Sequence, residues 1–179
     1  MKFNCLWRVL LAIFPLDIVS ADDPLAGVTQ GYFDGKRPFD AVELVGERGH
    51  ILIPESGKIE SQWVFKAGVL TASPKWDSLV TPDHYQDFRM HVEFNVNSVV
   101  DVDPEKNGNS GIYIQKRYEL QILNSHGVSE GDYKASYAGS LYRQKKPDKL
   151  VSRPAGEWQS YDIVFRAARF KDGKRTENA

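Results

Sequence analysis

The sequence predicts an all-β protein built as a sandwich of antiparallel strands. Residues 88–96 form the clearest strand, because apolar and polar side chains alternate there with a period of two. Several other short apolar runs are bounded by turn residues, and no stretch shows a convincing long helical period. Short strands with turns between them and no intervening helices favour the packing of sheet against sheet.

The composition is that of one globular domain. The chain has 179 residues, of which 41% are hydrophobic and 26% are charged, and its net charge is −1. This charge balance gives no support for a nucleic-acid-binding protein. A basic run at residues 143–153 contains Pro147 and Asp148 and lacks interleaved aromatic residues, so we interpret it as a solvated loop.

The first 21 residues have the pattern of a secretory signal peptide. A basic start precedes an apolar stretch at residues 9–16, and small residues lead up to Ala21. Pro15 and Asp17 make the segment a poor membrane span. We expect cleavage after Ala21 and a secreted or periplasmic protein without a stable membrane span; an uncleaved amphipathic anchor is the alternative.

Processing at that site would leave a chain without thiols. Cys5 is the only cysteine, so the mature protein would have neither a disulfide nor a cysteine nucleophile. Residues 22–31 show no periodic pattern and are expected to be a leader. The remaining residues, 32–179, are expected to form the single domain.

The first predicted elements of that domain are a turn and a strand pair. Residues 33–39 form a turn with aromatic anchors, and residues 63–73 form two strands around Gly68. Trp63 and Trp76 could stack on a sugar. Packing against the core is the more common role of tryptophan in a β-sandwich.

The strand at residues 88–96 carries two candidate catalytic groups. One face holds the apolar residues Phe88, Met90, Val92, Phe94 and Val96, and the other holds Arg89, His91, Glu93 and Asn95. Consecutive strands tend to be neighbours, so His91 and Glu93 could face the polar side chains of the hairpin that follows. His91 is then either a plain surface residue or a catalytic base.

An acidic loop at residues 101–109 has the alternating oxygen side chains of a calcium site. When the loop is aligned as an EF-hand from Asp103, Gly108 falls at the sixth position, but Ile114 stands at the twelfth, where glutamate is needed. We therefore expect no metal and no other cofactor.

Residues 107–124 predict a β-hairpin around which the chain is organised. A loop of residues 116–118 separates apolar from polar side chains, because it puts the isoleucine and leucine side chains on one face of the hairpin and the polar side chains on the other. The polar face carries Tyr113, Gln115, Glu119 and Gln121. That face is either the solvated side of an antiparallel sheet or a surface that holds a sugar.

Three clusters in order resemble the 3-keto-disaccharide hydrolase family. They are NSGIY at residues 109–113, YELQILN at 118–124 and GEWQSYDI at 156–163. The resemblance extends more loosely from about residue 33 to about residue 165. It implies a concanavalin A-like jelly roll, similar to lectins and glucanases, and an enzyme that acts on 3-keto-glucosides as a lyase and hydratase.

The resemblance also implies roles for single residues. Glu119 is the first choice for the catalytic base, with His91 or Glu93 second. The residues implied to contact the small-molecule or oligosaccharide substrate are Gln121, Asn109, Tyr113, Tyr142 and Trp158. Two alternatives remain: a glycosidase that uses Glu93 and Glu119 as paired carboxylates, and a carbohydrate-binding module whose aromatic residues stack on sugars without catalysis.

The end of the chain departs from the family pattern. Residues 125–136 predict a long loop, residues 138–142 resemble a short strand of the family, and residues 156–166 predict the last strand. Relatives then continue through further strands, including an asparagine-glycine turn. We expect those strands to be missing after Arg166, which would leave open sheet edges.

Overall fold

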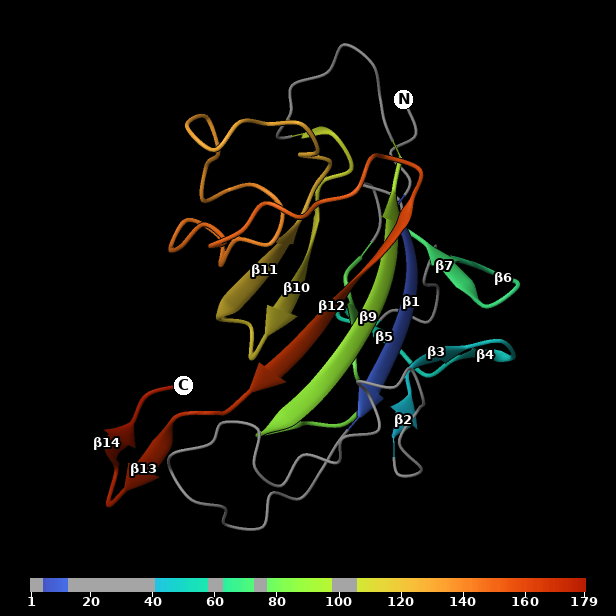
Figure 1. Cartoon of the computed structure of the whole chain (residues 1–179). Coiled ribbons are helices and arrows are strands. Elements are labelled where there is room, and N and C mark those ends of the chain that lie inside the picture. The colour runs from blue at the N-terminus through green and yellow to red at the C-terminus, as the bar shows by residue number, and fades with distance from the viewer. Residues whose placement is uncertain (1–4, 13–40, 58–62, 73–76, 98–105) are drawn as a thin grey trace.

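The computed structural model describes residues 5–12, 41–57, 63–72, 77–97 and 106–179 (Figure 1). Within these residues the regular elements are β-strands, and every strand pair is antiparallel. No helix in this part of the chain is long and apolar enough to cross a membrane. The predicted all-β sandwich is confirmed.

The larger layer is a six-stranded sheet with the order β12-β9-β1-β7-β6, in which β2 also pairs with β1. Its strands are β1 (Cys5–Ala12), β2 (Val42–Glu43), β6 (Val64–Lys66), β7 (Val69–Thr71), β9 (Phe88–Val96) and β12 (Trp158–Phe165). The predicted strand at residues 88–96 coincides with β9, and the predicted pair around Gly68 corresponds to β6 and β7. The last predicted strand corresponds to β12.

Four two-stranded sheets complete the described fold. They are formed by β3 (Val45–Gly46) with β4 (Gly49–His50), β5 (Ile53–Pro54) with β8 (Leu79–Val80), β10 (Ser110–Ile114) with β11 (Tyr118–Ile122), and β13 (Arg169–Lys171) with β14 (Lys174–Glu177). The β10–β11 hairpin lies over the face of the large sheet that carries the core, as Figure 1 shows.

The core lies between β9, β12 and the β10–β11 hairpin. Phe94 and Ile122 are 1% and 0% exposed and belong to one apolar cluster. The ring of Tyr161 in β12 lies 4.7 Å from that of Phe94, and its hydroxyl donates a 2.8 Å hydrogen bond to the Gln121 carbonyl of β11. The hairpin and β9 therefore belong to different layers.

The expectation that β9 lies beside the hairpin is wrong. β12 pairs with β9 from Phe165 opposite Phe88 to Trp158 opposite Asn95, and β1 occupies the other edge of β9. Both edges are thus filled by strands that are distant from β9 in the sequence. Burial of the same apolar face of β9 and β12 outweighs the tendency of consecutive strands to pair.

The hairpin loop is shifted by one residue from its predicted position. The loop comprises residues 115–117, Ile114 pairs with Tyr118, and Tyr113 pairs with Glu119. A tight turn closes it: the Arg117 N–H donates to the Ile114 carbonyl at 3.0 Å. Because the observed and predicted loops both have an odd length, the predicted division of side chains between the two faces survives.

The predicted strand at residues 138–142 is not a regular strand. Three backbone hydrogen bonds join it to β11, and Leu141 forms only an isolated bridge with Leu120. Left-handed φ angles at Gly139 (73°) and Arg143 (57°) bound the segment and prevent an extended ladder. The segment nevertheless covers one edge of β11.

The chain forms a further hairpin after Arg166, which was not predicted from the sequence; whether the further strands of the family are missing stays a prediction. β13 and β14 pair across a turn at Asp172 and Gly173, whose φ angles are 51° and 74°. An aspartate-glycine pair is a strong sequence signal for this kind of turn.

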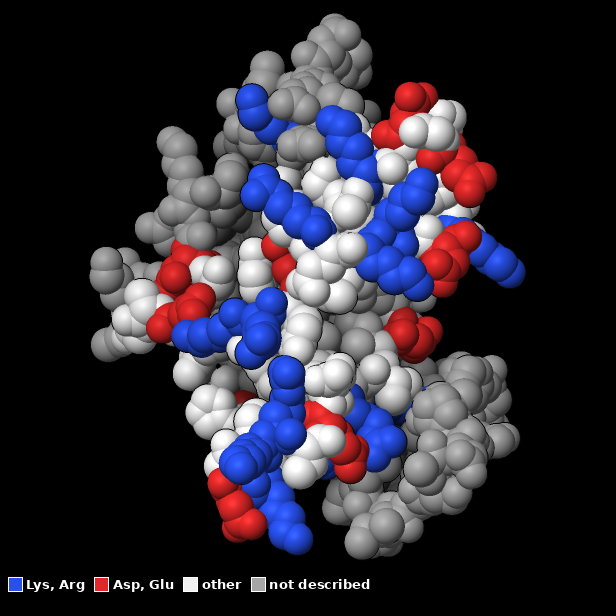
Figure 2. All heavy atoms as spheres, turned by 90° about the vertical axis from the view of Figure 1, so that its left-hand side faces the viewer, with Lys and Arg blue, Asp and Glu red and all other residues white. Residues whose placement is uncertain are grey.

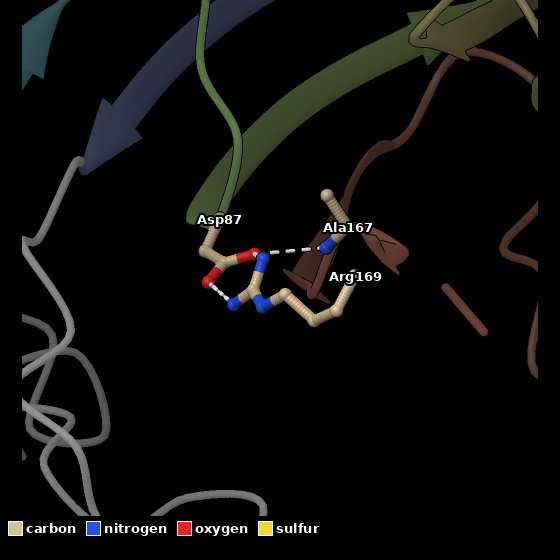
Figure 3. A network of polar contacts seen from close by, with 3 residues as sticks. All are labelled: Asp87, Ala167 and Arg169. Atoms are coloured by element: carbon tan, nitrogen blue, oxygen red, sulfur yellow. Dashed lines mark hydrogen bonds and ion pairs between the residues drawn. The ribbon is translucent and has the colours of Figure 1, made fainter. Parts of the chain in front are cut away.

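Asp87 anchors this C-terminal hairpin to the start of β9 (Figure 3). Its Oδ1 accepts hydrogen bonds from the Ala167 N–H (2.8 Å) and Arg169 (3.1 Å), and its Oδ2 accepts a second one from Arg169. Partial burial alone would raise the pKa of Asp87, but the hydrogen bonds from Arg169 and Ala167 outweigh it and lower that pKa.

Some predicted features lie outside the described residues, namely Trp76, the turn at residues 33–39 and the acidic loop at residues 101–105. Trp63 is described. It packs against the core, and its indole N–H donates to the Asp77 carbonyl at 2.8 Å, in agreement with the structural role expected of it.

Strand β1 lies inside the segment predicted to be a signal peptide. It pairs with β9 over eight residues and also contacts β7 and β2, so it stands in the interior of the sheet. Cleavage after Ala21 would remove this strand and open the facing edges of β9 and β7. Cleavage itself stays a prediction.

We expect a chain that lacks residues 1–21 to unfold at a lower urea concentration than the full chain and to self-associate, because two sheet edges lose their partner. Urea denaturation and size-exclusion chromatography measure both effects. A chain that lacks only residues 1–4 keeps β1 and is the control. If the chain that lacks residues 1–21 has the same urea midpoint as the full chain, β1 has no structural role, and its removal as part of a signal peptide is favoured.

Asp87→Asn should destabilise the protein by about 1.5–3 kcal/mol at neutral pH, because it weakens charge-assisted hydrogen bonds to a partly buried arginine. Since folding lowers the pKa of Asp87, the stabilisation is present above the unfolded-state pKa and is lost as the pH falls through the folded-state value. Chemical denaturation at several pH values measures this. Asp148→Asn removes an exposed pair with Lys145 and should change stability little; equal effects of the two variants would refute the anchor.

Candidate functional site

The outer face of the β10–β11 hairpin carries the candidate site. Ile122 is buried in the core, so Glu119 and Gln121, which alternate with it, project from the other face of β11. Tyr113 stands directly opposite Glu119, and Gly111 directly opposite Gln121. The predicted polar face is therefore present.

The carboxylate of Glu119 lies over Gly111. A Cβ atom built on Gly111 would be 2.9 Å from Glu119 Cγ and nearer still to one carboxylate oxygen. Because the φ angle of Gly111 is not in the left-handed region, glycine is needed here for space rather than for backbone conformation. Glycine at this position lets the carboxylate lie against the sheet, partly buried.

Tyr113 is the second polar group of the site and is 64% exposed. Its hydroxyl lies close enough to the Glu119 carboxylate to interact with it. Partial removal of the phenol from water, followed by that interaction with the negatively charged Glu119, raises the pKa of Tyr113 to about 12. The phenol is therefore protonated at neutral pH and remains a hydrogen-bond donor.

Tyr142 borders the same site from the segment that covers β11. Its N–H donates to the Glu119 carbonyl at 2.9 Å, and its phenol is close enough to contribute to the raised pKa of Tyr113. The guanidinium of Arg143 lies 5.1 Å from the centre of the Tyr142 ring. A cation therefore lies on the rim of the site, a feature that the sequence did not indicate.

Gln121 is buried, so it is not placed to contact a substrate directly. It is 1% exposed, and its Nε2 donates to Asn109 Oδ1 at 3.1 Å and to the Ile122 carbonyl at 3.3 Å. Its Oε1 is buried and has no partner among the described residues. Asn109 is exposed, so Gln121 orients the amide of Asn109 toward the surface.

The structure does not bring His91 and Glu93 to this site. They project from β9 on the side opposite to the buried Val92 and Phe94, whereas Glu119 projects from the hairpin on the far side of the core. The two carboxylates therefore leave opposite faces of the sandwich. They cannot flank one glycosidic bond, so the hypothesis of a Glu93–Glu119 glycosidase loses its pair.

His91 has a partner that the sequence did not indicate. Its Nδ1 lies 2.7 Å from Oδ1 of Asp162, the residue opposite it on β12. The two side chains are 22% and 67% exposed. This pair stabilises a solvated cross-strand contact, in keeping with the interpretation of His91 as a surface residue.

Trp158 also lies away from Glu119. It lines a hollow at the edge of the large sheet, together with Glu93 and residues of the loop at 133–153. The structure thus divides the predicted residues between two places. Glu119, Tyr113, Tyr142, Asn109 and Gln121 gather on the hairpin, and Glu93 and Trp158 gather at the β12 edge.

The hairpin site offers acid–base chemistry and hydrogen bonding to oxygen atoms. It combines a partly buried carboxylate, a neutral phenol and an amide, the groups needed to remove a proton and to hold hydroxyls. Among the described residues, no cluster of three or more His, Cys, Asp or Glu is placed to hold a metal ion.

Residues 48–173 match the family model of the 3-keto-alpha-glucoside-1,2-lyase-like domain. The fold is also similar to the crystal structure of a protein provisionally named a glycosyl hydrolase, from Parabacteroides distasonis ATCC 8503. The TM-score is 0.70 with 31% identity, over 78% of this chain and 59% of the other. The chain thus spans about three fifths of that protein. Curated protein sequences gave no significant match.

Replacing Glu119 should lower the pKa of Tyr113 from about 12 toward that of free tyrosine, because Glu119→Gln removes the negative charge beside the phenol. Gly111→Ala should act in the same direction by displacing the carboxylate. Ultraviolet absorption of the phenolate during an alkaline titration measures this, with Tyr113→Phe to assign the signal.

Glu157→Gln, which changes an exposed carboxylate, is the matched control.

Since folding raises the pKa of Tyr113, the contribution of Tyr113 to the stability of the fold is complete below about pH 10 and disappears as the pH rises to about 12. A Tyr113 signal that titrates identically in the Glu119→Gln variant would contradict the contact.

Proposed function

The chain belongs to the 3-keto-alpha-glucoside-1,2-lyase-like domain family, and on that premise we propose that it cleaves the glycosidic bond of 3-keto-glucosides. The observation that carries this proposal is the carboxylate of Glu119, which lies over Gly111 and opposite Tyr113 on the hairpin that bears the family motifs. The similar structure from Parabacteroides distasonis agrees with a hydrolase acting on carbohydrate.

The proposed reaction begins with removal of a proton from C2 of the sugar. A ketone at C3 acidifies this C–H bond, so a carboxylate can act as the base. As the C2–H bond breaks, its electron pair forms the C1–C2 double bond, and the C1–O bond breaks with its pair on the aglycone oxygen. That oxygen takes up a proton, which completes the elimination.

Hydration then completes the cleavage. The oxygen of a water molecule adds to C1 of the unsaturated ketone, and a proton returns to C2. The sum of the two steps is hydrolysis of the glycoside, and the ketone at C3 is retained. A base that has taken the C2 proton in the first step is correctly protonated to return it in the second.

Glu119 is the base in this proposal. Its carboxylate is partly buried and is positioned by Gly111 beneath it, which supports a role that depends on geometry. The phenol of Tyr113 is a hydrogen-bond donor beside the Glu119 carboxylate and would hold that carboxylate in one orientation.

The donors around Glu119 would bind the oxygens of the sugar. Negative charge develops on the C3 oxygen as the C2 proton leaves, so a donor aimed at that oxygen lowers the barrier. Tyr113 stays protonated at neutral pH, and Asn109 presents an amide that Gln121 holds in place. Tyr142 adds an aromatic surface at the border of the site.

We expect Glu119→Gln to reduce kcat on a 3-keto-glucoside by about 10²-fold or more, because a positioned general base contributes about 10²–10⁴-fold. Gly111→Ala should also reduce kcat by moving the carboxylate, and Glu157→Gln should not. Product formation and exchange of the C2 hydrogen with deuterated water are the measurements.

The same assay separates the alternatives. Borohydride reduces the C3 ketone, so pretreated substrate should no longer be cleaved if elimination is the mechanism. Full turnover by the Glu119→Gln variant would reject Glu119 as the base. Calorimetric binding of an unmodified oligosaccharide, without any product from the keto substrate, would instead establish a carbohydrate-binding module.

A further inference from the structure

A hollow lies at the β12 edge of the large sheet and is separate from the Glu119 site. Its volume is about 330 Å³, at the lower end of the roughly 300–1,000 Å³ usual for ligand pockets. Its described lining includes Trp158 and Ser160 of β12, Glu93 of β9, and Tyr133, Lys149 and Arg153 of the loop. Glu119, Tyr113 and Tyr142 do not line it.

The wall of the hollow is fixed at two points. The Arg153 N–H donates to Gln159 Oε1 of β12 at 3.3 Å, and His126 Nδ1 lies 2.8 Å from the Ser152 carbonyl. On the inner side, Tyr133 is buried, and its hydroxyl donates to the Ala138 carbonyl at 2.8 Å. The first contact holds the loop against β12 and the other two join parts of the loop to each other, so the hollow has a defined shape.

Two lining cations have no carboxylate partner among the described residues. Lys149 and Arg153 make no ion pair there, whereas the neighbouring Lys145 pairs with Asp148 at 3.1 Å. Glu93 is the one carboxylate among the described lining residues. Glu93 therefore balances only part of the positive charge of the hollow, and an anionic group of a ligand would neutralise the rest.

Trp158 supplies an aromatic surface in the same hollow and is 39% exposed. An indole that is both apolar and accessible can cover the C–H face of a sugar ring. Ser160 and Glu93, opposite each other on β12 and β9, can bond to hydroxyl groups beside that ring. The size, the aromatic surface and the two cations fit one sugar residue with an acidic substituent.

The surrounding surface would attract such a ligand. Figure 2 views the molecule from the side on which the loop and the β10–β11 hairpin lie in Figure 1, and Lys and Arg side chains are numerous there, with Asp and Glu side chains among them. The exposed basic residues at 143–153 are Arg143, Lys145, Lys146, Lys149 and Arg153, of which Lys145 is paired with Asp148. The other cations beside the hollow raise the local concentration of anions.

We propose that this hollow is a second carbohydrate-binding site, which takes an acidic sugar residue. The anionic substituent, a carboxylate or a sulfate, binds Lys149 and Arg153, and the ring of the sugar stacks on Trp158. The site favours a sugar over single-stranded nucleic acid, which needs a row of stacking surfaces. Trp158 is the most exposed aromatic ring of the hollow, because Tyr133 is buried and Tyr161 is only partly exposed.

Binding of short oligosaccharides to the full chain by calorimetry tests the proposal. The probes are an oligogalacturonate, a sulfated heparin-derived oligosaccharide, a neutral malto-oligosaccharide and a single-stranded oligonucleotide. We expect at least one acidic oligosaccharide to bind, the neutral one to bind much more weakly, and added salt to weaken the acidic one. The two acidic probes distinguish a carboxylate from a sulfate.

The double variant Lys149→Ala/Arg153→Ala should weaken binding of the acidic oligosaccharide by about tenfold or more. Trp158→Ala should also weaken it, with Trp158→Phe retaining most of the affinity as a check on folding. The matched control is Lys171→Ala/Lys174→Ala, two exposed lysines on β13 and β14 that lie outside the hollow.

Several outcomes would overturn the proposal. They are equal binding of the neutral probe, unchanged affinity in the Lys149/Arg153 variant, and an oligonucleotide that binds as tightly through the same residues. Glu119→Gln should bind the acidic probe like the wild type, because Glu119 lies outside the hollow. Loss of activity at Glu119 and loss of binding at this hollow are thus measured separately.

Discussion

Burial of one face of β9 is the constraint on which the rest of the structure depends. Val92 and Phe94 point into the core, where Ile122 of the hairpin meets them, so the residues that alternate with them must point outward. The same rule applied to β11 sends Glu119 out of the opposite layer. Packing of two apolar faces therefore separates Glu93 from Glu119 and leaves each with different neighbours.

The second layer owes its rigidity to contacts that its own strands do not supply. The Tyr161 hydroxyl ties β11 to β12, and residues 138–142 cover the edge of β11 with backbone hydrogen bonds. An isolated two-stranded hairpin is only marginally stable in water. These contacts hold Glu119 above Gly111, and a positioned carboxylate of this kind suits proton transfer better than a mobile one.

The two candidate sites differ in their charged groups. The hairpin site carries Glu119 beside a neutral phenol, whereas the hollow at the β12 edge carries Lys149 and Arg153 without ion-pair partners among the described residues. Elsewhere a cation is neutralised where it is partly buried, as Arg169 is by Asp87. The unbalanced cations thus remain where a ligand can reach them.

The sequence by itself determined which side chains share a face. Alternation with a period of two is local, so the faces of β9 and of the hairpin, and the grouping of Glu119 with Tyr113, followed without knowledge of the fold. The C-terminal hairpin was also within reach, through its Asp172-Gly173 turn. Only the tertiary structure decided which strands are neighbours, and hence that Glu93 joins Trp158 rather than Glu119. Strand order depends on which apolar faces bury one another over long separations in the sequence, and no local pattern contains that information.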